Sequence, residues 1–482
     1  MESQSVSYGD ENMKTSGETS GSQPEAFDVG EIQTNQVQDV DTDILEPVVF
    51  TQDFIRFELE NKGFLNPDSK ITFSVSATSS ASDCFYPINL GVNSLIRSCR
   101  LTCGGKTIQE IEDWNYYFAY KSMFVESEDN KNREQYLTSR MISHDFEYNS
   151  TIAPDGTYNA NDTEADAYGI DNGVEMKMAT SSKELHQWSY MSNEPVFQIA
   201  VGDLFPYLRS KDLPLYALEE KVQIELTLSS ATSGIRGCNS SGSTIATKDN
   251  NVFNINRDDV RLIADYMYLP QEQMESLRST MANVTTNYVD YRLSKMSVTN
   301  TTAKNLIRNI GGAGKVVTKI FTGLSMTDDG EVLGNTNLVN LFTADSTDYN
   351  TGTGISGSLT ANVKFNGNFL YPIDVENSAH HYYNVQRAEG VAPKISRAEY
   401  DFAQSFGVTD RKLVGHKQDA NLNGLFFYQA YSMNRNERVN SRGIELYHNY
   451  QNMLAGSYIL RTWLETGKQV IYANGICQVR DV

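Results

Sequence analysis

The sequence predicts an all-β protein that is divided into two domains. The chain has 482 residues, which is more than one hydrophobic core usually supports. It contains 27 Tyr and 21 Phe, and aromatic residues favour strands. Apolar and polar residues alternate along much of the chain, whereas sustained helical periodicity is scarce. Short strands with polar turns along a whole chain are typical of sandwiches and barrels.

The alternating segments carry the prediction of strands. Ile71, Phe73 and Val75 point to one face of a strand, and the polar residues between them point to the other. This pattern is typical of a sheet with one face on a core and the other in water. Two long polar segments, residues 149–183 and 345–358, are expected to be loops. Further alternating segments lie at residues 55–59, 221–230, 314–321, 361–367 and 468–479.

A Gly-Gly pair, Gly104 and Gly105, precedes Lys106 and Thr107, an arrangement that resembles the end of a phosphate-binding loop. A Walker A loop requires a glycine where this chain has Arg100. Glycine also supplies the positive φ that tight hairpin turns need. The sequence therefore predicts a turn between two strands here, and no nucleotide site.

Helical patterns are brief and occur at residues 112–124 and 271–281. The first segment contains an aromatic cluster. Such clusters cover the open end of a sandwich or pack at an interface more often than they bind a ligand, and a ligand platform is the alternative. The cluster consists of Trp114, Tyr116, Tyr117, Phe118 and Tyr120.

Residues 1–46 are predicted to form a flexible, acidic N-terminal arm. They contain eleven Asp and Glu and one Lys, a net charge of −10, and are too polar to bury much surface. The second half of the arm carries spaced apolar residues that are candidate contacts with a neighbouring molecule; a plain solvated tail is the alternative. These candidates are Phe27, Val29, Ile32, Val37, Ile44 and Leu45.

Charge and hydropathy exclude several functions. The net charge of −21 argues against direct binding of nucleic acid, because affinity for phosphate backbones comes from Lys and Arg. No apolar run approaches the roughly 20 residues of a membrane-spanning helix, and the N-terminus lacks the layout of a signal peptide. We therefore expect synthesis in the cytosol, while contact with a membrane stays open.

The sequence indicates no cofactor and no metal. The cysteines are odd in number and too scattered for a disulfide framework, so free thiols in a reducing compartment are expected. Cys99 and Cys103 share a strand face but lack a second pair at zinc-like spacing. His380 and His381 are adjacent, which on a strand would direct them to opposite faces. The five cysteines are Cys84, Cys99, Cys103, Cys238 and Cys477.

Several segments resemble double jelly-roll major capsid proteins, in the versions found in polinton-like viruses and virophages. These proteins are related to the capsid proteins of nucleocytoplasmic large DNA viruses and of tailless double-stranded DNA phages. The resemblance covers residues 53–479, and its motifs follow the order of the family. They include "DLPLYALEEKVQIELTL" at 212–228, "DVRLIADYMYLPQEQMESL" at 259–277 and "LNGLFFYQAYSMNRNERVNSRGIEL" at 422–446.

The resemblance implies two tandem eight-stranded antiparallel jelly rolls with long loops and a few short helices. The expected domains are the arm at 1–46, a first jelly roll at 47–256 and a second at 257–482. It also implies a structural, non-enzymatic subunit of the virion capsid. Such subunits form homotrimeric, pseudo-hexameric capsomers in an icosahedral shell around double-stranded DNA. The implied partners are other copies of the chain, penton proteins and minor or cement proteins.

The alternative function is that of a β-sandwich protein that binds or cleaves glycans. Glu110 and Glu112 are a pair of carboxylates, but as neighbours on one strand they do not flank a glycosidic bond. No nucleophile elbow or His-Glu-x-x-His helix is found.

Overall fold

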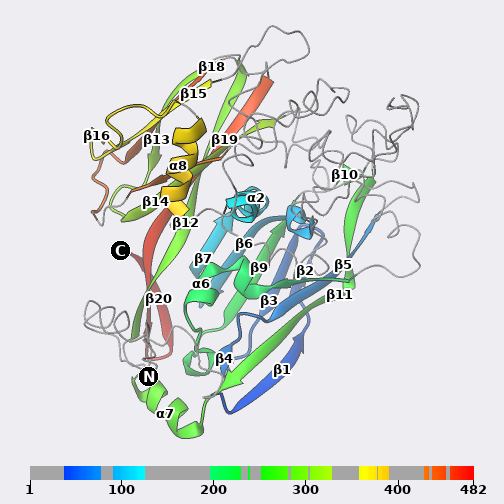
Figure 1. Ribbon diagram of the computed structural model, residues 1–482. Helices are drawn as coiled ribbons and strands as arrows, with labels where there is room; N and C mark the ends of the chain where they lie inside the picture. Colours follow the sequence, from blue (N-terminus) through cyan, green and yellow to red (C-terminus); the bar gives the residue numbers. More distant parts are fainter. Residues whose placement is uncertain are drawn as a thin grey trace, which may run out of the picture.

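The computed structural model describes twelve segments of the chain. Within them the chain forms two β-sandwiches, each made of two antiparallel sheets. The first sandwich occupies the lower part of Figure 1 and the second the upper part. The described segments are residues 37–77, 91–124, 196–229, 237–238, 251–280, 284–301, 304–327, 358–376, 378–389, 428–433, 437–451 and 456–482.

The first sandwich contains eleven of the described strands. One sheet has the order β1 (Asp39–Leu45), β11 (Asn251–Tyr268), β5 (Lys70–Ala77) and β8 (Val196–Ala200), with β4 (Phe64–Leu65) and β10 (Gly237–Cys238) also paired to β11. The other has the order β2 (Val49–Phe50), β3 (Phe54–Glu58), β9 (Val222–Leu228), β6 (Ile96–Cys103) and β7 (Lys106–Glu112).

The second sandwich is built on two 18-residue strands that pair with each other, β12 (Val284–Thr301) and β19 (Gly456–Ala473). On its other side, the first part of β19 pairs with β14 (Val317–Thr327) and the last part pairs with β20 (Ile476–Asp481). The strand β17 (Tyr428–Ser432) pairs with the free edge of β14 and completes the sheet. The facing sheet has the order β13 (Lys304–Gly311), β18 (Ile444–Gln451), β15 (Ser358–Phe365) and β16 (Asn368–Phe369).

The helices of the described segments are short. Both predicted helices are confirmed, as α2 (Trp114–Phe124) and α7 (Gln271–Thr280). The others are η2 (Gly91–Leu95), α5 (Val201–Leu204), α6 (Pro206–Ser210), η4 (Leu215–Ala217) and α8 (Ser378–Glu389).

The placement of His380 and His381 on a strand is wrong, because both lie in α8. His381, Asn384 and Val385 are buried, whereas His380 is exposed. The buried positions therefore recur at the spacing of one helix face. The polar identity of two of these positions hid this pattern in the sequence.

The division between the sandwiches differs from the expected one. The predicted boundary between residues 256 and 257 falls inside β11, which pairs with β1 and β5 of the first sandwich. The chain crosses to the second sandwich at α7, at the bottom of Figure 1. The predicted arm likewise includes β1, an edge strand of a sheet, and residues 1–36 lie outside the described segments.

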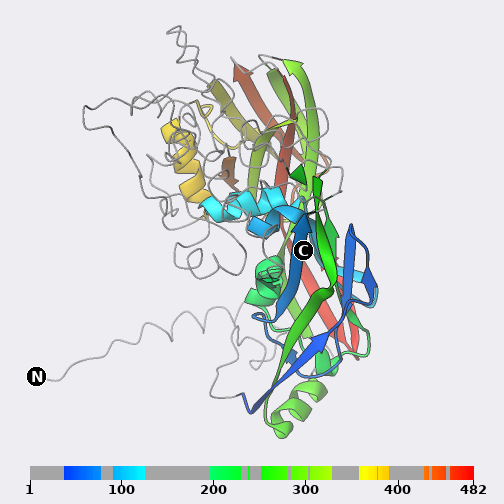
Figure 2. The same cartoon turned by 90° about the vertical axis from the view of Figure 1, so that its right-hand side faces the viewer.

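The two sandwiches do not have two separate cores. One cluster of buried side chains fills the second sandwich. The other fills the first sandwich and continues into the lower half of the long sheet, through Tyr288, Trp463, Val470 and Tyr472. Figures 1 and 2 show the consequence: β12 and β19 extend from the second sandwich down alongside the first.

The predicted Gly-Gly turn is confirmed as the connection between β6 and β7. Gly104 and Gly105 have φ values of +56° and +77°, a left-handed region that glycine adopts without the steric cost of a Cβ. A Cβ at Gly104 would lie 2.2 Å from the Glu220 carboxyl carbon, whereas a Cβ at Gly105 would meet nothing within 4 Å. The absence of a side chain at Gly104 thus permits both the backbone conformation of the turn and the close approach of the Glu220 carboxylate.

This difference predicts unequal costs for two neighbouring substitutions. Gly105→Ala should cost about 1–2 kcal/mol, the strain of a left-handed alanine. Gly104→Ala should cost clearly more, because the Glu220 carboxylate must also leave its hydrogen bond to the Cys477 amide. Calorimetric unfolding of both variants measures the difference. Equal losses of unfolding free energy in the two variants would show that the Glu220 side chain moves aside without a measurable cost.

Candidate functional site

The most elaborate contact of the described segments joins the two sandwiches. The strand β7 lies at the edge of its sheet, and edge strands expose unpaired backbone groups. Here β7 packs against β12 and β20 of the second sandwich, and side chains of β19 and β12 contact the end of β7 and the start of α2. Because this contact fixes how the sandwiches are oriented, it is the candidate site for a structural role.

A buried ion pair lies at the centre of the contact. Asp113, between β7 and α2, adopts a φ of +50°, and its side chain is 7% exposed. Its Oδ2 accepts a hydrogen bond from Arg461 Nε at 2.8 Å, and its Oδ1 lies 2.6 Å from Lys295 Nζ. Burial alone would raise the pKa of Asp113, but the charges of Arg461 and Lys295 outweigh it and lower the pKa.

The predicted aromatic cluster surrounds this ion pair. Trp114, Tyr116, Tyr117 and Phe118 are buried, whereas the side chain of Tyr120 lies outside the described part. The Arg461 guanidinium lies 3.5 Å from the centre of the Tyr116 ring, a cation–π contact. Tyr117 contacts Tyr291 and Phe321 of the second sandwich. The prediction of interface packing is thus confirmed for the four described side chains.

Hydrogen bonds extend the contact along β7. Gln109 is fully buried; its amide donates to Val289 O at 2.9 Å, and its oxygen accepts from the Tyr207 amide at 3.0 Å. Tyr288 donates its hydroxyl to Ile108 O, and Trp463 Nε1 donates to Glu112 O. The second sandwich therefore supplies partners for the Gln109 amide and for two backbone carbonyls of this edge strand.

Three cysteines are free and buried, as predicted for these positions: Cys99, Cys103 and Cys477. Cys84 and the side chain of Cys238 lie outside the described part. Cys103 ends β6, and Cys477 lies in β20 of the other sandwich. Both contact the carboxylate of Glu220.

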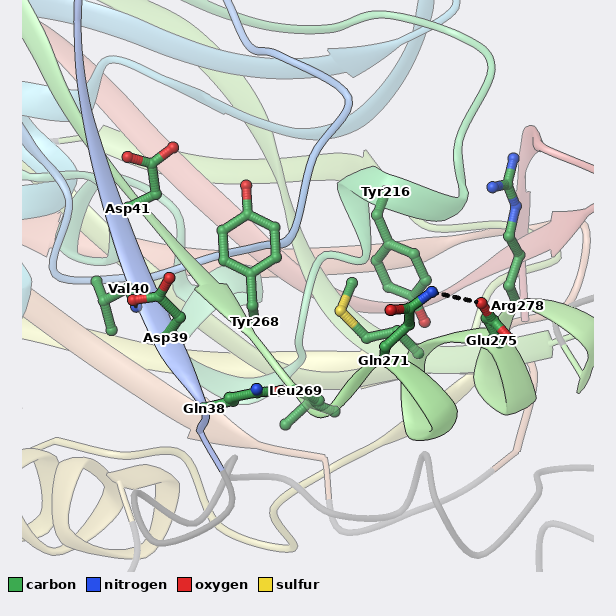
Figure 3. Close-up of a pocket in the computed structure, with 11 residues that line it drawn as sticks. Gln38, Asp39, Val40, Asp41, Tyr216, Tyr268, Leu269, Gln271, Glu275 and Arg278 are labelled. Atoms are coloured by element: carbon green, nitrogen blue, oxygen red, sulfur yellow. Dashed lines mark hydrogen bonds between the residues drawn. The ribbon is translucent and has the colours of Figure 1, made fainter.

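An open groove of about 620 Å³ lies between the start of β1 and α7 (Figure 3). Its lining mixes aromatic rings, the carboxylates of Asp39, Asp41 and Glu275, and one cation, Arg278. Gln271 Nε2 donates to Glu275 Oε1 at 2.9 Å. None of these lining residues is a Ser, Cys, Lys or His. The remaining lining residues are Gln38, Val40, Tyr216, Tyr268, Leu269 and Met274.

Three of the six predicted arm contacts can be located. Val37 and Leu45 are half-buried, and Leu45 packs against the first core, while Ile44 is 62% exposed. Ile44 and Leu45 lie on β1, whose residues 39–45 pair with β11. Phe27, Val29 and Ile32 lie outside the described residues.

The strand β1 is held to the sandwich by charged side chains as well. Lys62 Nζ lies 2.9 Å from Asp41 Oδ2 and 2.5 Å from Asp43 Oδ2. The opposite face of β1 presents Val40, 52% exposed, and Ile44. The alternation of Asp39, Asp41 and Asp43 with Val40, Thr42 and Ile44 could have indicated this strand, which sequence reasoning assigned to the flexible arm.

The second sandwich carries an apolar row that sequence reasoning missed. Ile307 on β13 lies directly opposite Tyr447 on β18, and the Tyr447 ring is 5.1 Å from that of Phe369 on β16. Ile307 is 61% exposed and Phe369 52%. We call Ile307, Tyr447 and Phe369 the outer row. The sequence feature that could have indicated this row is the adjacent apolar pair Leu306 and Ile307, which interrupts the alternation of apolar and polar residues along β13.

The geometry gives no support to glycan chemistry. Glu110 is half-buried beside Asp290, and burial raises the pKa of both carboxyls; they lie in the contact between the sandwiches. Glu112 is exposed at the end of β7. The ring of His381 is buried against Leu359 O at 3.2 Å.

Within the segments that the structure describes, no group of three or more His, Cys, Asp or Glu residues has the arrangement of a metal site. In the same segments, no helix combines the length and apolarity that crossing a bilayer would need.

Comparison with known proteins identifies the architecture. Residues 69–270 match the family described as "Major capsid protein N-terminus". This match ends at the start of α7, where the chain leaves the first sandwich. No curated protein matches the sequence.

Solved structures resemble the whole chain. The Sputnik virophage structure aligns with a TM-score of 0.55 at 12% identity, over 94% of this chain and 90% of the other. The mavirus major capsid protein aligns with 0.52 at 8% identity, over 100% and 96%. The PBCV-1 virus capsid aligns with 0.52 at 12% identity, over 94% and 99%. The predicted all-β, double jelly-roll fold is confirmed.

The contact between the sandwiches generates a prediction about its ion pair. Asp113→Asn keeps the side-chain shape and tolerates the left-handed backbone, but removes the Asp113 charge from beside the buried Arg461 guanidinium. Losing one partner of a buried pair costs about 3–5 kcal/mol, so the Tm of a chain of this length should fall by about 3–5 °C. Differential scanning calorimetry near pH 7 measures the shift.

The control and the pH dependence follow from the same geometry. Asp68→Asn breaks a 2.6 Å pair with Arg209 at the surface and should cost at most about 1 kcal/mol. Because the folded pKa of Asp113 is lowered, its stabilisation is present above the unfolded pKa and is lost as the pH falls through the folded one. The deficit of Asp113→Asn should therefore shrink below about pH 4. A deficit no larger than that of Asp68→Asn would contradict the role of the pair.

Proposed function

We propose that this chain is a double jelly-roll major capsid protein, and that three copies of it form a pseudo-hexameric capsomer of an icosahedral shell around double-stranded DNA. The protein has a structural role in the virion capsid and is not an enzyme. Self-assembly into a lattice follows from this role. Penton proteins and minor or cement proteins are the proposed further partners, and the host cytoplasm is the proposed place of synthesis.

The single observation that carries the proposal is the rigid pairing of two similar sandwiches in one chain. The shared core and the buried Asp113 pair hold them in one orientation. Three such chains around an axis present six similar units. Closed symmetry of this kind keeps an assembly finite.

The outer row supports the trimer. Exposed apolar patches on soluble proteins often mark interaction surfaces, and the outer row covers the face of a sheet opposite to the second core. A ring of three copies requires a contact between two different surfaces of the chain. The outer row is the surface that we assign to this contact on the second sandwich.

The first test is the mass of the assembly. Full-length protein at micromolar concentration should have three times the 54.0 kDa chain mass by light scattering. Ile307→Lys or Phe369→Lys should weaken association at least tenfold, because a charge would be buried against apolar surface. Asn305→Lys adds the same charge two residues from Ile307, at an exposed polar position, and should have a much smaller effect. A monomeric wild type would refute the trimer.

We further assign the arm to contacts between capsomers. The apolar residues Phe27, Val29, Ile32 and Val37 precede β1, which anchors the arm in the first sandwich. Deleting residues 1–36 should leave trimers intact, with an unchanged Tm, but reduce shell assembly as counted by electron microscopy. Deleting residues 1–45 also removes β1 and should lower the Tm. Normal shells from the shorter deletion would refute the tether.

A further inference from the structure

Two thiols meet where the sandwiches touch. Cys103 is the last residue of β6, and Cys477 is the second residue of β20. Both are fully buried and free. Cys103 Sγ and the Cys477 amide lie 4.0 Å and 2.8 Å from the same Glu220 oxygen, and interaction with the Cys477 thiol raises the pKa of Cys103. Nothing in the capsid role requires two cysteines from different sandwiches at one point.

Glu220 holds both cysteines in place. Its Oε2 accepts a hydrogen bond from the Cys477 amide at 2.8 Å, and the Cys103 Sγ lies 4.0 Å from the same oxygen. Lys106 Nζ lies 3.5 Å from Glu220 Oε1 and donates to Cys477 O at 2.7 Å. One carboxylate and one ammonium therefore link the segments that carry the two sulfurs.

The backbone next to each cysteine is also fixed. The Gly104 amide, directly after Cys103, donates to Lys221 O at 3.1 Å. The Glu219 amide donates at 2.9 Å to Gly475 O, in the turn before Cys477. A Cβ at Gly475 would lie 2.7 Å from the Glu219 side chain, so this turn packs tightly on the first sandwich. The two sulfurs cannot easily move apart.

We propose that Cys103 and Cys477 are a disulfide-forming pair, which joins the two jelly rolls covalently when the protein meets a small disulfide such as oxidised glutathione. A thiolate attacks the glutathione disulfide, and the second thiolate then attacks the mixed disulfide. The S–S bond of glutathione breaks, one S–S bond forms in the protein, and two reduced glutathione molecules leave with the two thiol protons. The protein is oxidised and the glutathione disulfide is reduced.

The surroundings make this reaction slow in the folded protein. The interaction with the Cys477 thiol and burial raise the pKa of the Cys103 thiol, and the thiolate is the reacting form. The pair therefore stays reduced in a reducing cell and closes over long exposure outside it. Because the bond would close a very long loop, it restricts the unfolded chain strongly. We expect the oxidised protein to be more stable than the reduced one.

Cys99 is not a competing partner. It lies on the same strand face as Cys103, about 13 Å away at the rise of an extended chain, which is too far for a disulfide. Its thiol instead contacts Leu204 O at 3.3 Å. Cys99 thus provides the matched control.

The test uses full-length protein incubated with oxidised glutathione at pH 8, then alkylated in denaturant. Peptide mapping without reductant should recover the Cys103–Cys477 cross-linked peptide, and a phosphine reductant should abolish it. The Tm should rise by about 5 °C or more on oxidation. Cys103→Ser and Cys477→Ser should each lose the cross-link and the Tm rise, while Cys99→Ser should retain both.

The wild-type mapping decides the matter even if a variant fails to fold. Alkylation of both Cys103 and Cys477 after prolonged incubation, or a cross-link that instead includes Cys84 or Cys238, would overturn the proposal. Its failure would leave the capsid function untouched, because the trimer mass is measured on reduced protein. A trimer defect would in turn leave the mapping result unchanged.

Discussion

The shared sheet is the constraint on which the rest of the structure depends. The strands β12 and β19 pair along nearly their whole length, from Val284 opposite Tyr472 to Thr301 opposite Gly456. Their upper part faces the second core, and their lower part packs on β7 of the first sandwich. One sheet therefore belongs to both sandwiches. Because a strand cannot bend freely without losing its ladder, the sandwiches are held in one orientation, as the proposed capsomer with regular sides would require.

The sequence predicted those parts of the fold that local chemistry determines. The alternation around Phe73 and the glycines at Gly104 and Gly105 each specify their own structure, since side-chain direction and φ are properties of a few residues. The position of β11 is different. Its 18 residues include the polar run around Arg257 and Asp258, where the pairing with β5 is interrupted. Its assignment to the first sandwich depends on distant partners.

The candidate site was predicted only in part for the same reason. The aromatic cluster beginning at Trp114 indicated an interface, because so much aromatic surface must be covered. Its polar centre could not be read, since Asp113 and Arg461 are far apart in the chain and neither has an unusual local pattern. The outer row also depends on β13 lying beside β18. Ile307 is a surface residue only in that register.

The polar side chains in the contact between the two sandwiches give it a role that a purely apolar contact would not have. A wholly apolar contact would be as stable or more so, but apolar surfaces can slide by one residue at modest cost. Asp113, between Arg461 and Lys295, and Gln109, between Val289 and Tyr207, are satisfied in one register only. A shift would leave buried polar groups without partners, at about 1–3 kcal/mol each. The polar groups thus select one arrangement of two sandwiches whose apolar surfaces alone would permit several.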